Sequence, residues 1–137
     1  MNRNDFQNLS RIRMKESKCL LDNGKFDGAY YICGYIIDCG LKACFAKKIK
    51  KYDFPDKRIA NESHKHDPYS LVRTAELGPE LDKKIKKFPE FAINWAIVKD
   101  WNEKSRYEKH MKKEAEDLYS AVVSKTDGVF EWIKQHW

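Results

Sequence analysis

The sequence has few of the residues that interrupt helices or cross-link a chain, since its 137 residues include six glycines, four prolines and four cysteines. It also lacks the strict alternation of apolar and polar residues that marks a half-buried strand, and it contains neither internal repeats nor low-complexity tracts. Hydrophobic residues make up 42% and aromatic residues 13% of the chain, which excludes an intrinsically disordered protein. We therefore predict one all-α domain over residues 1–137.

The cysteines form no CxxC pair, and each lies in a segment with helical periodicity. Cys33 and Cys44 would share one helix face, but about three turns, roughly 16 Å, separate them, too far for a common metal ion or a disulfide. His64 and His66 lie two residues apart without further ligands nearby, so we predict no metal there either. We expect no metal, no disulfide and no cofactor.

The N-terminal ten residues are polar, and no apolar segment with a small-residue cleavage site follows them. We therefore expect no signal peptide and a cytoplasmic protein. The most apolar stretch, residues 29–46, contains Asp38, Lys42 and three tyrosines, which suits a buried helix better than a membrane span. No membrane partner is expected.

The chain carries 27 Lys and Arg residues against 21 Asp and Glu residues, a formal net charge of +6. A positive field of this size favours anionic partners such as RNA or nucleotides. Alternatively, the charge covers solvated helix faces, because much of it lies in short mixed runs such as residues 47–51, 83–87 and 109–116. Charge alone leaves both interpretations open.

The first half of the chain predicts a helical hairpin. Apolar residues recur at helical spacing over residues 5–23, and Gly24 is a typical C-terminal stop. Asp27 can cap a second helix, to about residue 48, which is apolar on nearly all sides and should be the central one. Residues 52–68 show little periodicity, which is typical of a surface loop. Small residues in the second helix let neighbouring helices approach closely: Gly28, Ala29 and Gly34.

The second half predicts shorter helices. Asp67 and Pro68 offer an N-cap and a first-turn proline for one short helix, and another short turn fits residues 79–86. Pro89 can begin a further helix, which residues 102–107 should end or bend.

The final helix is predicted as one element over residues 115–137, with Gly128 as a tolerated weak point. We expect an up-and-down helical bundle of four long helices plus one or two short ones. Its core or a dimer contact should hold the four tryptophans, Trp95, Trp101, Trp132 and Trp137.

Three segments carry a resemblance to a known family: residues 20–43 (LLDNGKFDGAYYICGYIIDCGLKA), residues 64–67 (HKHD) and residues 100–107 (DWNEKSRY). In this order they resemble the HEPN family, the small helical domains found beside nucleotidyltransferases and in prokaryotic toxin and defence systems. The resemblance spans most of the chain. It implies an all-α domain that acts on or binds RNA or nucleotides.

Ribonucleases of that family carry an Arg and a His with about four to six residues between them, near the start of the last helix, and two such sites meet across a dimer. The matching residues here are Arg106 and His110, with the shorter interval of three residues between them. If that segment is α-helical, a four-residue step leaves both side chains facing one cleft. The resemblance then implies metal-independent RNA cleavage, with His110 accepting the proton of a ribose 2′-OH and Arg106 holding the phosphate.

Three further residues are binding candidates for the same site. Asp38 and Lys42 are charges inside an apolar segment at i,i+4 spacing. They form either a local ion pair at the edge of the core or a site in which Asp38 orients Arg106. Tyr107 either stacks on a base or plugs the bundle, and packing is the favoured role.

Three functions are compatible with these residues. The first is a homodimeric ribonuclease that uses Arg106 and His110, as the toxin half of a toxin–antitoxin or defence pair. The second is a non-catalytic module that binds a nucleotide or docks a minimal nucleotidyltransferase. The third is a helical adaptor without a ligand. The short Arg–His interval favours the last two, whereas the basic charge and the Arg106–Tyr107 pair favour the first two.

Overall fold

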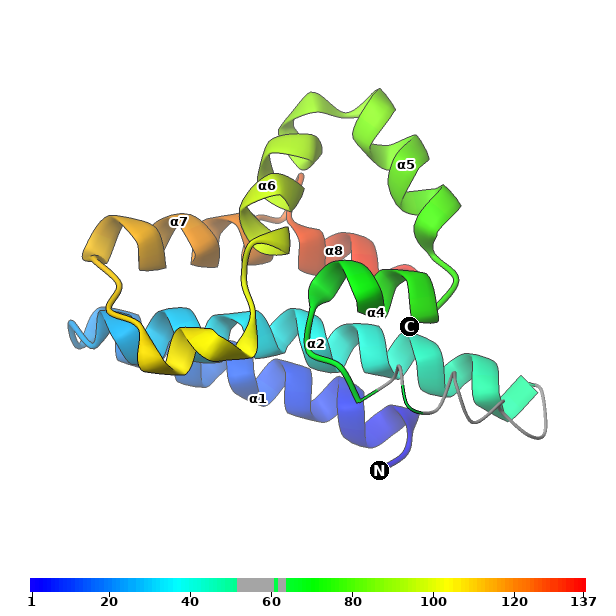
Figure 1. The fold of residues 1–137 in the computed structure, drawn as a ribbon, viewed down its shortest axis with the longest axis horizontal. Coiled ribbons are helices and arrows are strands. Elements are labelled where there is room, and N and C mark those ends of the chain that lie inside the picture. Colours follow the sequence, from blue (N-terminus) through cyan, green and yellow to red (C-terminus); the bar gives the residue numbers. More distant parts are fainter. Residues whose placement is uncertain (52–60, 62–63) are drawn as a thin grey trace.

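A computed structural model describes residues 1–51, 61 and 64–137, and this part of the chain folds into helices and their connections, without strands. The all-α prediction is therefore confirmed. Two long helices, α1 (Arg3–Asp22) and α2 (Phe26–Lys51), lie side by side as a hairpin (Figure 1). Most of the loop predicted over residues 52–68 lies outside the described residues.

Helix α1 begins and ends where its sequence provides caps. The side chain of Asn2 accepts a hydrogen bond from the backbone N–H of Asp5, and the Asp5 carboxylate accepts one from the N–H of Asn2, each at 2.9 Å. After the helix, Gly24 has a φ of 72°, a left-handed conformation that favours glycine. The predicted stop at Gly24 is confirmed.

Helix α2 is the central element, as its all-round apolar pattern predicts. It packs against α1, α4 (Pro68–Thr74), the 3-10 helix η1 (Glu103–Tyr107), α7 (Lys112–Val123) and α8 (Val129–Lys134). Its buried apolar side chains point to several sides: Ala29, Cys33, Ile36, Ile37, Cys39, Leu41, Ala43, Cys44 and Phe45. A charged side chain on a buried face of this helix therefore needs an oppositely charged or hydrogen-bonding partner inside the domain.

A second group of helices rises from the hairpin, formed by α4, α5 (Gly78–Lys87) and α6 (Pro89–Lys99) (Figure 1). The side chain of Asp67 accepts a hydrogen bond from the N–H of Ser70 at 3.0 Å, and Pro68 and Pro89 each stand in a first turn. The predicted helix starts are confirmed. Helix α6 ends at Lys99, before η1, as the pattern of residues 102–107 indicates.

The last helix differs from its prediction, because it is divided into α7 and α8. Ser124 leaves the helical conformation, with ψ of 130°, and the amide of Asn94 in α6 donates a hydrogen bond to the carbonyl of Asp127 at 2.9 Å. A Cβ at Gly128 would lie 2.2 Å from the Ser124 carbonyl oxygen, so this turn closes too tightly for a side chain. The break redirects α8 onto α2.

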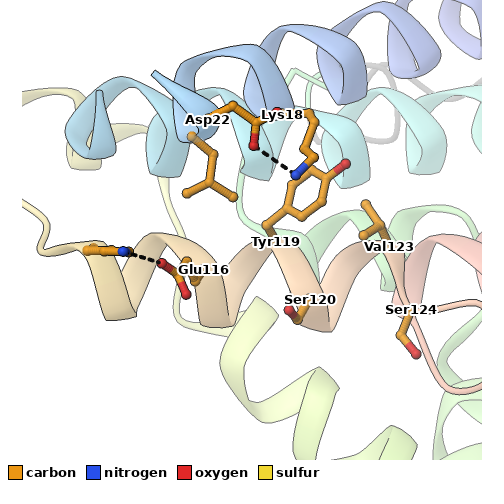
Figure 2. A pocket seen from close by; sticks show the side chains of 9 residues that line it. Lys18, Asp22, Glu116, Tyr119, Ser120, Val123 and Ser124 are labelled. Carbon is orange, nitrogen blue, oxygen red and sulfur yellow. Dashed lines mark hydrogen bonds and ion pairs between the residues drawn. The ribbon is translucent and has the colours of Figure 1, made fainter. Parts of the chain in front are cut away.

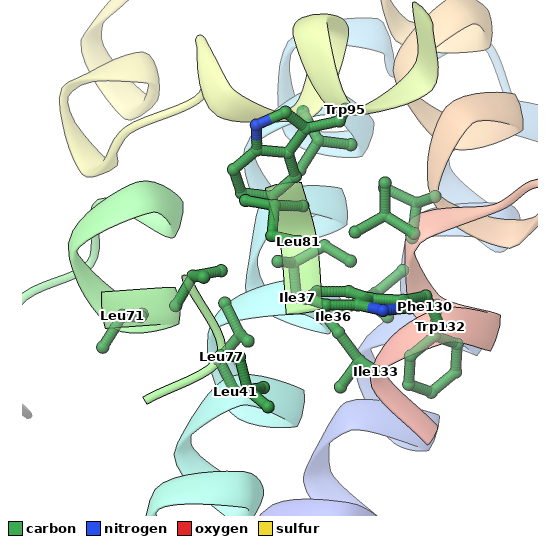
Figure 3. Packing of buried hydrophobic residues seen from close by; sticks show 14 of the residues in the cluster. Ile36, Ile37, Leu41, Leu71, Leu77, Leu81, Trp95, Phe130, Trp132 and Ile133 are labelled. Atoms are coloured by element: carbon green, nitrogen blue, oxygen red, sulfur yellow. The ribbon is translucent and has the colours of Figure 1, made fainter. Parts of the chain in front are cut away.

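The core lies between α2, α7 and α8 and the group formed by α4, α5 and α6 (Figure 3). Trp95, Trp101 and Trp132 are at most 4% exposed, and the partly buried Trp137 packs against the same cluster. The core role predicted for the tryptophans is confirmed. Among the described residues, no helix is both long and apolar enough to span a bilayer.

Thiol reactivity should separate Cys19 from the other cysteines. Cys33, Cys39 and Cys44 are buried, and burial raises the pKa of each thiol to about 12, whereas Cys19 is exposed. Because the thiolate is the reactive form, the native protein at pH 8 should show one fast-reacting thiol toward a disulfide reagent. Four should react after denaturation. Cys19→Ser should abolish the fast reaction, and a second fast thiol in the native protein would contradict the packing of α2.

Candidate functional site

One face of α2 carries a row of polar side chains at four-, three- and four-residue intervals: Tyr31, Tyr35, Asp38 and Lys42. This spacing aligns them along the helix. The row lines an open groove of about 480 Å³, to which α1 contributes Phe6, Leu9 and Arg13. Solvent therefore reaches a row of side chains that can bind a ligand.

Asp38 is the buried centre of this row, with its side chain 3% exposed. Its Oδ2 lies 2.9 Å from Nζ of Lys42, and its Oδ1 lies 2.8 Å from Nδ1 of His66, in the segment before α4. A carboxylate at this depth is stable only if its oxygens are paired. The predicted ion pair with Lys42 is confirmed, and the further partner of Asp38 is His66 rather than Arg106.

His66 connects α2 to η1. Its Nδ1 donates a hydrogen bond to Asp38, because an ionised carboxylate can only accept. Nζ of Lys42 lies 3.3 Å from the same nitrogen, but both atoms are then donors, so they form no hydrogen bond with each other. The other ring nitrogen, Nε2, lies 3.7 Å from Oε2 of Glu103 in η1. The side chain of His66 is 29% exposed, so the ring is held on one edge and accessible to solvent in part.

Aromatic rings hold His66 and η1 against α2. The Tyr35 ring meets the His66 ring edge-on at 5.6 Å between centroids and the Trp101 ring at 5.1 Å. The hydroxyls of Tyr31 and Tyr35 are 3.2 Å apart. Burial, together with the hydrogen bond to Tyr31, raises the pKa of Tyr35. Tyr35 therefore offers a neutral hydroxyl beside the imidazole.

Arg106 reaches the same row from η1. Its guanidinium lies 4.7 Å from the centroid of the Tyr107 ring, and contacts with Tyr107 and with the Tyr31 hydroxyl raise the pKa of Arg106. Both residues are exposed, Tyr107 to 78%. The packing role favoured for Tyr107 is therefore wrong. The 3-10 turn buries Ser105 and directs the next two side chains, Arg106 and Tyr107, toward solvent.

His110 lies apart from this row, in the irregular segment between η1 and α7, so the α-helical step assumed between Arg106 and His110 is wrong. Its ring stacks on Tyr30 at 3.7 Å between centroids, and its side chain is 6% exposed. Nδ1 lies 3.2 Å from Glu114, a hydrogen bond that lowers the pKa of Glu114, and Nε2 lies 3.7 Å from Glu108. The imidazole is fixed in a structural contact.

A larger hollow of about 720 Å³ lies between the end of α1 and α7 (Figure 2). Its charged side chains pair with one another, Lys18 with Asp22 at 2.8 Å and Lys112 with Glu116 at 3.8 Å. It contains none of the predicted site residues. We therefore place the candidate site on the polar row of α2.

The structure thus pairs Asp38 with Lys42, places Arg106 and its neighbour Tyr107 beside Tyr31 of the same row, and leaves out His110. His66 is a further member of the site that was not predicted from the sequence. The signal for it was the buried charge of Asp38, which needs more than one partner. Compared with known proteins, the chain matches no protein-family model, no curated protein and no solved structure.

Proposed function

We propose that this protein is a HEPN-like domain that binds RNA or a nucleotide at the η1 end of the polar row. One observation carries the proposal: among the described residues, no carboxylate pairs with the exposed guanidinium of Arg106, which lies over the exposed ring of Tyr107. A guanidinium matches two phosphate oxygens with its planar fork, and an exposed ring offers a face to a base. The two components of a nucleotide are thereby matched by adjacent side chains.

The net charge of +6 supports an anionic ligand, because a positive field attracts the phosphate backbone before contact. The groove along Tyr31, Tyr35 and Lys42 extends from this end and gives a strand room to continue. Our proposal includes a homodimer, for which the neighbouring Met111, 76% exposed, offers apolar surface. Sedimentation equilibrium would measure that association.

Binding of a fluorescein-labelled, mixed-sequence single-stranded RNA, followed by anisotropy at low salt, tests the proposal. Arg106→Ala should weaken binding by about tenfold or more, because a charge-assisted hydrogen bond contributes about 1.5–3 kcal/mol. Tyr107→Ala should weaken it by a similar factor through lost stacking. Lys113→Ala, which removes an exposed cation of α7 that pairs with Asp117, is the matched control and should bind as the wild type does.

Competition with ATP separates the two ligand sources. Displacement of the RNA by ATP at equal phosphate concentration indicates a mononucleotide site, whereas retention of the RNA indicates a site for a strand. Wild-type protein that leaves the anisotropy unchanged, or an Arg106→Ala variant that binds as tightly as the wild type, would overturn the proposal.

A further inference from the structure

We infer that His66, oriented by Asp38, transfers the proton in a metal-independent cleavage of the bound RNA, and that His110 does not. This inference rests on the proposed RNA binding and adds a reaction to it. It follows from the position of the two imidazoles, only one of which is both oriented by a buried carboxylate and accessible.

The contact with Asp38 holds His66 in the orientation that a general base requires. A carboxylate that is 3% exposed accepts the Nδ1 proton at 2.8 Å, which fixes the tautomer and leaves the lone pair on Nε2. Lys42 holds the second oxygen of Asp38 at 2.9 Å, so the carboxylate cannot rotate away. The edge of Tyr35 confines the ring from another side.

Nε2 of His66 and the guanidinium of Arg106 are brought to the same side of η1. Glu103, whose Oε2 lies 3.7 Å from Nε2, stands three residues before Arg106. Side chains at i and i+3 of a 3-10 helix eclipse one another, so Glu103 and Arg106 share one face. The side chain of Glu103 is 52% exposed and has room to move aside when a ribose approaches Nε2.

These positions assign each part of the reaction. The neutral Nε2 of His66 accepts the proton of a ribose 2′-OH, and the 2′-oxygen forms a bond to the adjacent phosphorus. The bond from phosphorus to the 5′-oxygen breaks with its electron pair on that oxygen, which takes a proton from water. The products are a 2′,3′-cyclic phosphate and a 5′-OH end. Arg106 pairs with the non-bridging oxygens as their charge develops.

His110 lacks these properties. Its ring stacks on Tyr30, and its two nitrogens face Glu114 and Glu108 at 3.2 and 3.7 Å. A ribose would have to displace the stacked ring, whose side chain is 6% exposed, before reaching either nitrogen. The ring of His66, 29% exposed and not stacked on another ring, needs only Glu103 to move aside.

The test is cleavage of the labelled RNA in EDTA, with binding measured in parallel. His66→Asn is the main variant, because its amide N–H can still donate to Asp38 while the base is lost; His66→Gln is the second should the first fold poorly. Either should slow cleavage by about 100-fold or more and bind RNA within about twofold of the wild type. His64→Gln, an exposed neighbour in the same segment, should cleave normally.

Three further measurements separate the roles. The product should carry a 2′,3′-cyclic phosphate, and an RNA with 2′-deoxyribose throughout should bind without cleavage. Asp38→Asn, which leaves His66 in place but weakens its orientation, should lower kcat with KM unchanged.

The possible outcomes distinguish failure of the proposed cleavage from failure of the proposed binding. RNA binding by the wild type without cleavage, or cleavage that survives in both His66 variants, overturns this inference and leaves the proposed binding in place. Cleavage lost in His110→Gln but kept in His66→Asn returns the proton transfer to His110 and also overturns it. No RNA binding at all removes the proposed function and this inference together.

Discussion

Gly34→Ala should destabilise the domain by about 3 kcal/mol, because the added methyl group has to displace a buried indole. A Cβ at Gly34 would lie 1.9 Å from Cε2 and 2.1 Å from Cδ2 of Trp101. That indole is 1% exposed and is confined by Tyr31 and Tyr35, so it has no space to retreat. Urea unfolding followed by circular dichroism measures the loss, as a lower midpoint with an unchanged slope.

Gly28→Ala is the matched control, because both glycines lie in α2 and both gain the same methyl group. At Gly28 the added Cβ would meet the flexible Leu20 side chain at 3.4 Å, an ordinary contact. Its stability should stay unchanged or rise by up to about 1 kcal/mol, since alanine is the better helix former. Equal midpoints for the two variants would show that Trp101 does not pack on Gly34. In Gly34→Ala, the loss of the contact between Trp101 and α2 should also release η1, and with it Arg106, from α2.

Much of the fold was predictable because its signals are local. Gly24 ends α1, Asp67 caps α4, and Pro68 and Pro89 begin helices, each through the conformational preference of a single residue. The central position of α2 followed from its all-round apolar pattern. These features depend on residues that are close in the sequence, so they can be predicted from local sequence patterns.

The division between α7 and α8 was not predictable in the same way. Apolar residues recur on both sides of residues 124–128 as they would in one helix. Besides the tight turn at Gly128, the break carries a hydrogen bond from Asn94, 33 residues earlier, to the carbonyl of Asp127. Tertiary contacts of this kind override local periodicity.

The candidate site was predictable in part for the same reason. The Asp38–Lys42 pair follows from i,i+4 spacing on one helix, whereas His66 joins it from 28 residues away. Tyr107 was assigned to the interior because an aromatic residue near a helix end usually packs there. The three-residue period of η1 buries Ser105 instead and leaves Tyr107 outside.

The buried pair also has a structural role that can be separated from the proposed chemistry. Asp38→Asn should cost about 2–3 kcal/mol, because an amide has one acceptor for two donors. Its oxygen can accept from His66, but its NH₂ then faces Nζ of Lys42, which lies 2.9 Å from the replaced atom and whose side chain is 13% exposed. The melting temperature should fall by roughly 10 °C.

Adding Lys42→Met to Asp38→Asn should recover at least about 1 kcal/mol, because it removes the cation that the amide cannot satisfy. The matched control is Asp22→Asn in α1, which breaks a pair of the same i,i+4 spacing, Lys18–Asp22 at 2.8 Å, with both side chains more than half exposed. Its unfolding midpoint should stay where it is, since solvent screens that pair. Strict additivity of the two substitutions in the double variant would instead mean that Lys42 contributes nothing to holding Asp38, and that His66 alone orients the carboxylate.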